Sequence, residues 1–343
     1  MKKVLALVLV AMMMLGSVCA VAEDTTYTIG ICQLVQHVAL DAATQGFRDA
    51  ITEVLGDKVV FDEKNAFGDS PTCATIVNGF VSANVDLILA NATPALQAAA
   101  SASYDIPILG TSVTEYGVAL EIPDFTGVVG YNVSGTSDLA PLDQQAAMIV
   151  ELFPEAKNVG LLFCSSEPNS AYQVKVVAEE LAKVGITTKD FPFSDLNDVA
   201  AVTTAACEFS DVIYVPTDNT VASATGIVDG VCRPAGVPII AGEEGICSGC
   251  GVATLSISYY DLGYATGLMA LRILVDGEDI TKMPIEYAPN FTKKYNEEIS
   301  AEFGVTIPED YIAIGAEEEA EAAEEGETAE GTEAAEESEP AAE

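Results

Sequence analysis

The feature that most constrains the fold is a regular alternation of short apolar runs with segments of helical periodicity. Many of the runs are apolar on both faces, which is typical of strands buried inside a parallel sheet. The runs occupy residues 27–32, 59–62, 87–90, 106–110, 159–163, 187–191, 212–215, 239–241 and 251–256. Helical spacing of apolar residues marks the segments between them, at 39–55, 72–83, 94–102, 140–152, 170–184, 199–207, 220–235 and 260–275. This alternation predicts an α/β fold with parallel sheets flanked by helices.

The two halves of the chain repeat one pattern, which indicates two similar lobes instead of one wide sheet. A strand, a polar loop and a helix open at Ile29 (IGICQLVQHVALDAA) and again at Val159 (VGLLFCSSEPNSAYQVK). Each half later has a strand that ends in a small polar loop, ILANATPALQ in the first and IYVPTDNTVA in the second. Two lobes also suit a length of 343 residues, at roughly 150 residues per domain.

Charge and composition exclude several classes of function. The chain has 53 acidic and 14 basic side chains and a formal net charge of −39, so it has too few cations to neutralise the phosphates of a nucleic acid. Its one histidine, His37, excludes metal sites built on two imidazoles, and a Ser-His-Asp triad would have to use that residue. Neither GxGxxG nor GxxxxGK(S/T) occurs. We therefore expect no nucleic acid, no cofactor and no metal.

The first residues, 1–22, have the pattern of a bacterial export signal. Two lysines precede an apolar run from Val4 to Leu15, and small residues lead to a cleavage site after Ala22. A second interpretation is a lipoprotein signal, in which Cys19 carries a lipid anchor. The apolar run is too short for a stable membrane-spanning helix, and no other stretch is long and apolar enough to be one. Both interpretations place the mature protein outside the cytoplasm.

The last residues, 316–343, have a composition that does not support a fold. They consist of Glu, Ala, Gly, Thr and Ser with one Pro, and they carry 13 of the acidic side chains. Like charges repel one another and no large apolar residue is present to bury, so we expect a disordered acidic tail. The body that remains, 23–315, has 40 acidic and 12 basic residues and is acidic in its own right.

Polar residues follow most of the predicted strands, at the edge where open parallel sheets bind their ligands. Several of these loops open helices, whose free N–H groups favour a carboxylate or a phosphate. Carboxylates at Asp218 and Glu243 would suit an ammonium group, so the set fits a zwitterion. Thr93 and Asp218 also have a structural interpretation, as N-caps of the helices that follow them. The candidate ligand residues in the loops are Gln36, His37, Thr93, Thr111, Ser112, Ser165, Ser166, Asn169, Asp218, Asn219 and Glu243.

Stretches along nearly all of residues 27–290 resemble one known family. They are, in order, GICQLVQHVALDAATQGFRDAI, DLILANATPALQAAA, DIPILGTSVTE, NVGLLFCSSEPNSAYQVK, VIYVPTDNTVASA and ATLSISYYDLGYATGLMALRIL. The body resembles the substrate-binding proteins of ABC transporters with the type I periplasmic-binding fold, and among them those for tryptophan and other aromatic amino acids.

The resemblance implies two lobes joined by three crossover strands, near Gly130–Val133, Leu255–Tyr259 and Lys282–Glu286. Residues 23–132 and 259–282 would form the first lobe, and residues 133–258 and 283–315 the second.

The resemblance also implies a binding protein and not an enzyme. Its lobes would close on an amino acid, aromatic or apolar, and the monomer would present this ligand to an ABC permease in the membrane. The side chain of the ligand would lie between Leu34, Leu40 and Tyr259. Two alternatives stay open, a sugar or nucleoside ligand and a sensor that signals without transport.

The chain departs from the family at Gln36 and Val38, where members usually carry an acidic residue and a proline. One carboxylate for the ligand ammonium is therefore missing, and Glu243 or Glu244 is the candidate replacement.

Seven of the eight cysteines follow residue 22, and Cys247-x-x-Cys250 has several interpretations. A short disulfide, two free thiols, half of a metal site and a redox pair all fit this spacing. An exported chain favours disulfides, but an odd number of cysteines leaves one unpaired. A metal site would need Cys207 and Cys232 as further ligands.

Overall fold

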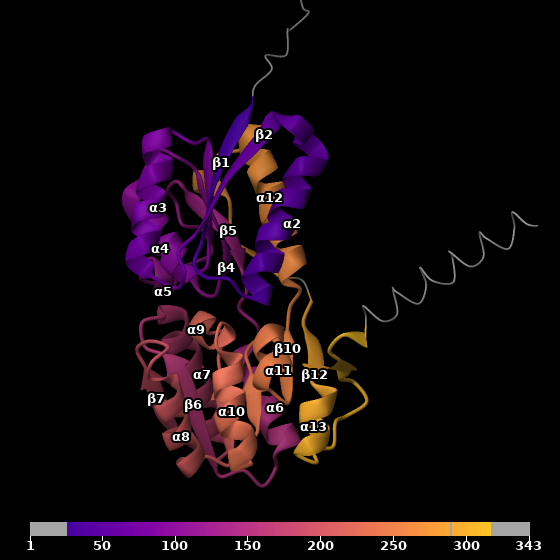
Figure 1. Cartoon of the computed structure of the whole chain (residues 1–343). Helices are drawn as coiled ribbons and strands as arrows, with labels where there is room; N and C mark the ends of the chain where they lie inside the picture. The colour runs from indigo at the N-terminus through magenta and orange to yellow at the C-terminus, as the bar shows by residue number, and fades with distance from the viewer. Residues whose placement is uncertain (1–25, 289, 317–343) are drawn as a thin grey trace, which may run out of the picture.

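The computed structural model describes residues 26–288 and 290–316, which form two α/β lobes placed end to end (Figure 1). The predicted fold class is confirmed, because each lobe contains a mainly parallel sheet flanked by helices. The expected export signal, 1–22, and residues 317–343 of the expected acidic tail lie outside the described residues. Within the described ranges, no helix has both the length and the apolar character that crossing a bilayer requires.

The first lobe is built on a six-stranded parallel sheet in the order β11-β5-β4-β3-β1-β2. Alternate strand residues point to opposite faces, so Ile31 and Leu89 pack in the layer of α2 and α12, whereas Cys32 and Ile88 pack with α3 and α4. Its strands are β1 (Tyr27–Gln33), β2 (Val59–Asn65), β3 (Leu87–Asn91), β4 (Ile108–Val113), β5 (Val133–Ser137) and β11 (Glu286–Tyr287). Its helices are α2 (Val38–Leu55), α3 (Ser70–Ala83), α4 (Thr93–Ala102), α5 (Tyr116–Ala119) and α12 (Tyr259–Leu274).

The second lobe has a seven-stranded sheet in the order β13-β12-β10-β9-β8-β6-β7, in which β10 and β12 are antiparallel. Leu161 and Tyr214 pack with α6 and α7, whereas Leu162 and Ile213 pack with α8, α10 and α11. Its strands are β6 (Asn158–Cys164), β7 (Thr187–Phe193), β8 (Val212–Val215), β9 (Ile239–Ala241), β10 (Ala253–Ser256), β12 (Thr292–Tyr295) and β13 (Ile312–Ala313). Its helices are α6 (Leu142–Leu152), α7 (Pro168–Lys183), α8 (Val199–Phe209), α9 (Asn219–Ala222), α10 (Thr225–Ala235), α11 (Glu244–Cys250) and α13 (Glu297–Glu302).

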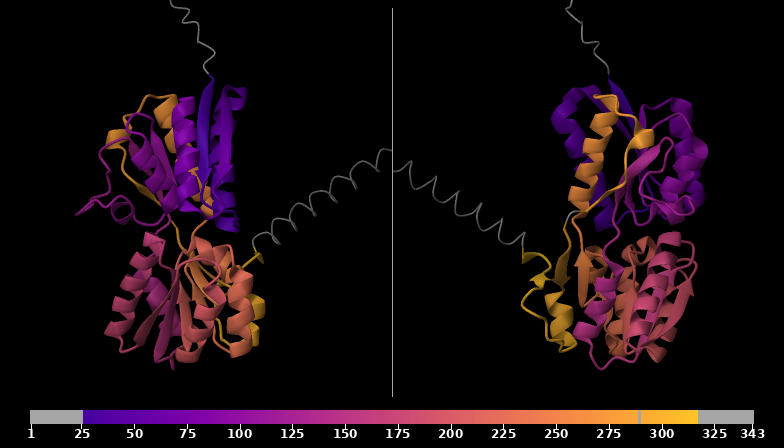
Figure 2. Two further views of the ribbon diagram at one scale, coloured as in Figure 1. Left: turned by 60° about the vertical axis from the view of Figure 1, so that its left-hand side comes forward. Right: turned by 180° about the vertical axis from the view of Figure 1, so that it is seen from behind.

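The chain passes between the lobes three times, from β5 to α6, from β10 to α12 and from β11 to β12 (Figure 2). The expected crossings at Gly130–Val133 and Lys282–Glu286 are too early, because β5 and β11 both pair in the first sheet. Residues 133–137 and 283–287 therefore belong to the first lobe and not to the second. The physical reason is that β5 reads VSGTS, a sequence that is buried but has no apolar run to mark it as a strand.

Helices α2 and α12 approach each other closely because glycine stands at their contact. A Cβ atom on Gly46 would overlap the carbonyl oxygen of Tyr260, and a Cβ atom on Gly263 would overlap that of Ala43. These two helices are more than 200 residues apart in the sequence, and they lie side by side in the first lobe (Figure 1). Their contact brings the chain back from the second lobe.

We expect Gly263→Ala to lower the free energy of unfolding by roughly 1–3 kcal/mol, because the added methyl group forces α2 and α12 apart. The matched control is Gly79→Ala in α3, where no heavy atom lies within 4 Å of the added Cβ. That variant should be neutral or up to about 1 kcal/mol more stable, because alanine favours helix over glycine. Chemical denaturation measures both effects, and equal effects at the two sites would contradict the close contact.

Candidate functional site

The carboxyl ends of the strands in the two lobes face each other, and their loops meet directly. Nε2 of His37, in the loop after β1, lies 3.2 Å from Oδ1 of Asn219, which follows β8 in the other lobe. Two predicted residues from opposite lobes are thus in contact. Figure 1 shows α5 of the first lobe and α9 of the second near this junction.

Glu167 fixes the orientation of the Asn219 side chain. One oxygen of its buried carboxylate accepts hydrogen bonds from the backbone N–H and the Nδ2 group of Asn219, at 3.0 and 2.7 Å. The other oxygen accepts from the backbone N–H and the hydroxyl of Thr220. Since Nδ2 of Asn219 is directed at Glu167, its Oδ1 is directed at His37. The imidazole must then carry its proton on Nε2 to donate across the cleft.

Three buried side chains lie close to one another beside the crossings between the lobes, although none of them lines the two cavities described below. We call Asp138, Glu243 and Tyr259 the floor cluster. The hydroxyl of Tyr259 donates to Oδ2 of Asp138 at 3.0 Å. Burial raises the pKa of Asp138 to about 6, and burial together with the nearby Glu244 and Asp138 carboxylates raises the pKa of Glu243 to about 7. Oδ1 of Asp138 has no hydrogen-bond partner among the described residues.

Backbone strain gathers at the strand ends that face the second lobe. Ala92, at the start of α4, has φ +91°, and Ser112, in β4, has φ +54°. Both values lie in the left-handed region that non-glycine residues rarely adopt, and such strain is common at binding sites. Ser112 also lies where the pairing of β4 with β5 is irregular, and its buried hydroxyl has no partner in the described chain. A ligand in the cleft would supply that partner.

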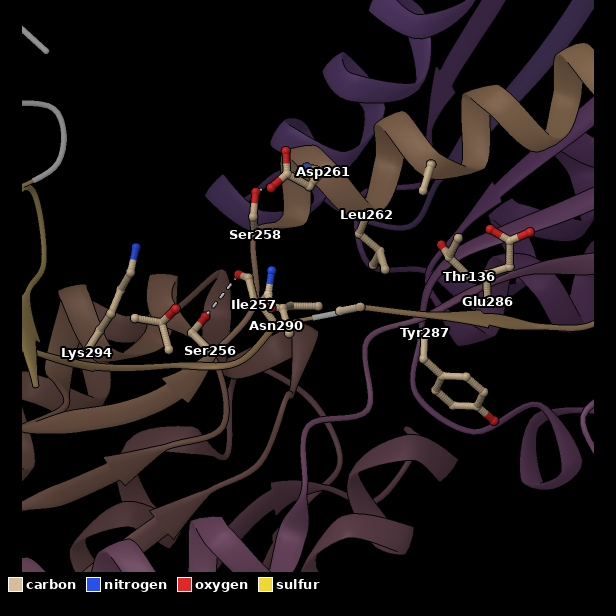
Figure 3. A pocket seen from close by; sticks show the side chains of 13 residues that line it. Thr136, Ser256, Ile257, Ser258, Asp261, Leu262, Glu286, Tyr287, Asn290 and Lys294 are labelled. Carbon is tan, nitrogen blue, oxygen red and sulfur yellow. Dashed lines mark hydrogen bonds between the residues drawn. The ribbon is translucent and has the colours of Figure 1, made fainter. Parts of the chain in front are cut away.

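Two cavities lie near this cleft. The first, about 290 Å³, opens between the lobes at the edge of the sheets far from the crossings, and we call it the mouth cavity. Leu34, Pro94, Ser166 and Asn219 are among its lining residues. The second, about 560 Å³, lies against the crossing segments, with Ile257, Asn290 and Tyr287 around it in Figure 3. No candidate ligand residue lines this second cavity, so the mouth cavity belongs to the candidate site.

The family model described as ABC transporter substrate binding protein matches residues 28–319. The chain belongs to this family. Substrate-binding proteins of this kind are extracytoplasmic. The resemblance read from the sequence is confirmed.

Several relatives support this assignment. A "Tyrosine-binding protein" of Clostridioides difficile (strain R20291) is 38% identical over 265 residues, which cover 75% of each chain. The structure of an ABC domain from Streptococcus pneumonia in complex with L-Trp has 33% identity and a TM-score of 0.79, covering 83% of this chain and 97% of that one. The open, ligand-free structure of a substrate-binding protein with adhesive properties from Clostridium difficile has 36% identity and a TM-score of 0.65, covering 84% and 99%.

The structure of this substrate-binding protein superposes better on the ligand-bound relative than on the open one. The TM-score with the L-Trp complex is higher than that with the open structure, although the open protein is slightly more similar in sequence. The contact of His37 with Asn219 and the burial of the floor cluster agree with a closed cleft.

Asp218 lies in the loop after β8 as predicted, and its contacts agree with the second interpretation given for it, a helix N-cap. Its carboxylate is 1% exposed, and its two oxygens accept from the backbone N–H groups of Cys164 and Val221 at 2.7 and 2.9 Å. Burial raises its pKa to about 8, and the nearby Glu167 carboxylate adds to the rise. Asp218 is thus the N-cap of α9 and a link to β6. Glu243 is similarly the N-cap of α11, with its oxygens on two backbone N–H groups.

The remaining candidates fall into three groups. Asn169 is buried at the cleft with an unpartnered Oδ1. Gln36, Ser165 and Ser166 are exposed, whereas Leu40, Thr93 and Thr111 are buried. Thr111 turns toward α12, because its hydroxyl accepts from Thr136, which contacts Thr266. Thr93 is the first residue of α4 and not its N-cap, which is Ala92. Tyr259 is the first residue of α12, not a residue of a crossover strand.

The seven described cysteines are free thiols. Cys247 and Cys250 are buried in α11, and burial raises the pKa of both thiols. A high pKa disfavours the thiolate that redox exchange needs. Sγ of Cys207 lies 3.6 Å from Sγ of Cys232, so these two thiols are neighbours. Among the described residues, they do not form a metal-binding group with Cys247 and Cys250.

The single histidine gives a direct test of closure. Burial lowers the pKa of His37 from its usual 6.5 in this closed form, and this effect exceeds the opposing ones of Asn219 and the nearby carboxylates. Because the open form exposes the ring to water, saturating ligand should move the NMR titration of His37 to lower pH. Because the pKa of His37 is lower in the closed form, protonation of the ring favours the open form. The contribution of His37 to closure is therefore complete above pH 6.5 and is lost as the pH falls below that value. An unchanged or higher pKa on ligand binding would contradict the contact.

Proposed function

We propose that this substrate-binding protein captures an aromatic amino acid in the cleft and delivers it to an ABC permease. The two relatives named for tyrosine and bound to L-Trp support this ligand class. In this proposal the ligand contacts both lobes, and it therefore shifts the population toward the closed form.

The observation that carries the proposal is the free oxygen of Asp138. A buried carboxylate oxygen without a hydrogen-bond partner in the described chain is costly, and an ammonium group within hydrogen-bond reach would offset that cost. Asp218 and Glu243 already use their oxygens as N-caps, so Asp138 is the better ammonium partner. Ser112, with its unpartnered hydroxyl, and the N-terminal N–H groups of α4 are suitable for the ligand carboxylate.

The arrangement of the cleft supports binding without catalysis. The hydroxyl of Ser165 donates to the carbonyl oxygen of Phe193, and that of Ser166 lies 2.9 Å from Sγ of Cys164. The partner of His37 is Asn219 and not a serine. We propose that the protein acts as a monomer, since closure needs two lobes free to move, and that it is exported by residues 1–22 or anchored through Cys19.

We expect L-tyrosine or L-tryptophan, and not ribose or glucose, to stabilise the purified protein. A ligand at a hundredfold excess over its Kd stabilises the folded state by about 2.7 kcal/mol, which a thermal-shift measurement detects. Calorimetric titration with tyrosine, tryptophan, phenylalanine, leucine and the two sugars then gives the Kd values. A response to the sugars alone would replace this proposal with a sugar-binding function.

We expect Asp138→Asn to weaken binding of the amino acid by roughly 10- to 100-fold, because a charge-assisted hydrogen bond to the ammonium is lost. The matched control is Asp218→Asn, a second buried carboxylate, which should change the Kd less than twofold. The affinity of the unmodified protein should also fall by up to about tenfold per pH unit below pH 6, where Asp138 takes up a proton. Asp138→Asn should remove that part of the pH dependence. The opposite ranking of the two variants would place the ammonium at Asp218.

A further inference from the structure

Phe67 combines two unfavourable features at one position. Its side chain is 85% exposed, and its backbone has φ +55°. A bulky side chain in the left-handed region is a conformational outlier, and an exposed phenyl ring forgoes the free energy of burial. Strain that persists in a folded protein points to a function of the residue that bears it.

The surrounding loop holds Phe67 in this conformation by backbone hydrogen bonds. The N–H of Phe67 donates to Oδ1 of Asn65 at 2.7 Å. On either side, the N–H of Ala66 donates to the carbonyl oxygen of Gln33 and that of Gly68 to the carbonyl oxygen of Leu34, at 2.9 and 2.8 Å. The loop after β2 is therefore fixed to the loop after β1, and the backbone of Phe67 cannot leave its left-handed conformation without breaking these contacts.

Phe67 lines the mouth cavity from the first lobe. β2 and β7 are the edge strands farthest from the crossings, so the loops that follow them form the opening of the cleft. Leu196, in the loop after β7, lines the same cavity from the second lobe and is 49% exposed. Val35 and Pro94 add apolar surface between them. Two exposed apolar side chains from opposite lobes thus border one cavity of about 290 Å³.

We propose that the mouth cavity is the subsite for the aromatic ring of the ligand, with Phe67 as the residue that covers the ring and Leu196 as the opposite wall. This inference rests on the proposed function and adds the residue that selects aromatic over aliphatic ligands. Ring-to-ring contact favours an aromatic ligand over an aliphatic one of similar apolar area. Contact with the ligand would also bury part of the Phe67 ring, which is 85% exposed in this structure.

The distance along the cleft favours a long ligand. Asp138 follows β5 and Phe67 follows β2, and these strands are four positions apart in the sheet, roughly 19 Å at the usual spacing between strands. This separation between strand axes exceeds the length of an amino acid, so a ligand that meets both residues has to be extended and both side chains have to reach toward it. Tyrosine and tryptophan have this shape, with the ammonium at one end and the ring at the other, whereas alanine and serine do not.

The test measures the Kd of L-tyrosine, L-tryptophan and L-leucine for the intact protein, Phe67→Ala and a control. Phe67→Ala should raise the Kd of tyrosine and tryptophan about tenfold and that of leucine by no more than about twofold. The control is Tyr104→Ala, which removes another exposed aromatic ring of the first lobe, 77% exposed and away from the mouth cavity. It should leave all three constants unchanged.

Phe67→Gly separates the ring from the strain, because glycine adopts a positive φ without cost. This variant should raise the thermal midpoint of the ligand-free protein and still weaken aromatic ligands as Phe67→Ala does. Unchanged Kd values in Phe67→Ala, or an equal loss of affinity for leucine and tyrosine, would overturn the subsite. The proposed function would still stand in that case if the unmodified protein binds tyrosine. Failure of the unmodified protein to bind either aromatic amino acid would overturn both.

Discussion

The contact between α2 and α12 determines how the two lobes are connected. Glycine at this contact lets α12 pack closely on α2 in the first lobe, and this packing stabilises the return of the chain from the second lobe. Because α12 returns, β5, β10 and β11 all lead into crossings. The loops at the carboxyl ends of both parallel sheets are thereby held face to face, and this arrangement creates the cleft.

Buried carboxylates in and near the cleft differ in what they do, and their hydrogen bonds show the difference. Glu167, Asp218 and Glu243 direct their oxygens at backbone N–H groups near helix starts, so they stabilise the loops of the second lobe. Asp138 accepts from the hydroxyl of Tyr259 and interacts with the side chain of Thr114, and its Oδ1 has no hydrogen-bond partner in the described chain. The first three carboxylates thus have a structural role, whereas the oxygen of Asp138 is the one that the proposed function assigns to the ligand ammonium. Burial raises the pKa of both Asp138 and Asp218, but the two carboxylates differ in their contacts. Both oxygens of Asp218 accept from backbone N–H groups, whereas one oxygen of Asp138 has no partner in the described chain.

The sequence was sufficient for the architecture where the strands are apolar on both faces. The runs at 212–215 and 239–241 have the same bounds as β8 and β9. It was insufficient for β5 and β12, because VSGTS and TKKY contain too few apolar residues to be recognised. Asp138 was missed for the same reason, since it follows a strand that was not predicted.

Asp218 could not be classified from the sequence, because a carboxylate after a strand looks the same whether it caps a helix or meets a ligand. The distinction depends on the N–H of Cys164, 54 residues away. Phe67 could not be recognised as a candidate from the sequence, because the positive φ of a phenylalanine is seen only in the structure.

The described chain begins with β1 in the first lobe and ends after β13 in the second, so its two ends leave from different lobes (Figure 1). A mechanical load applied between those ends has to pass through the hinge. Three crossing segments carry that load in parallel, so each bears a fraction of it. The three segments can therefore bend easily, which closure requires, and still resist extension, because they share the load.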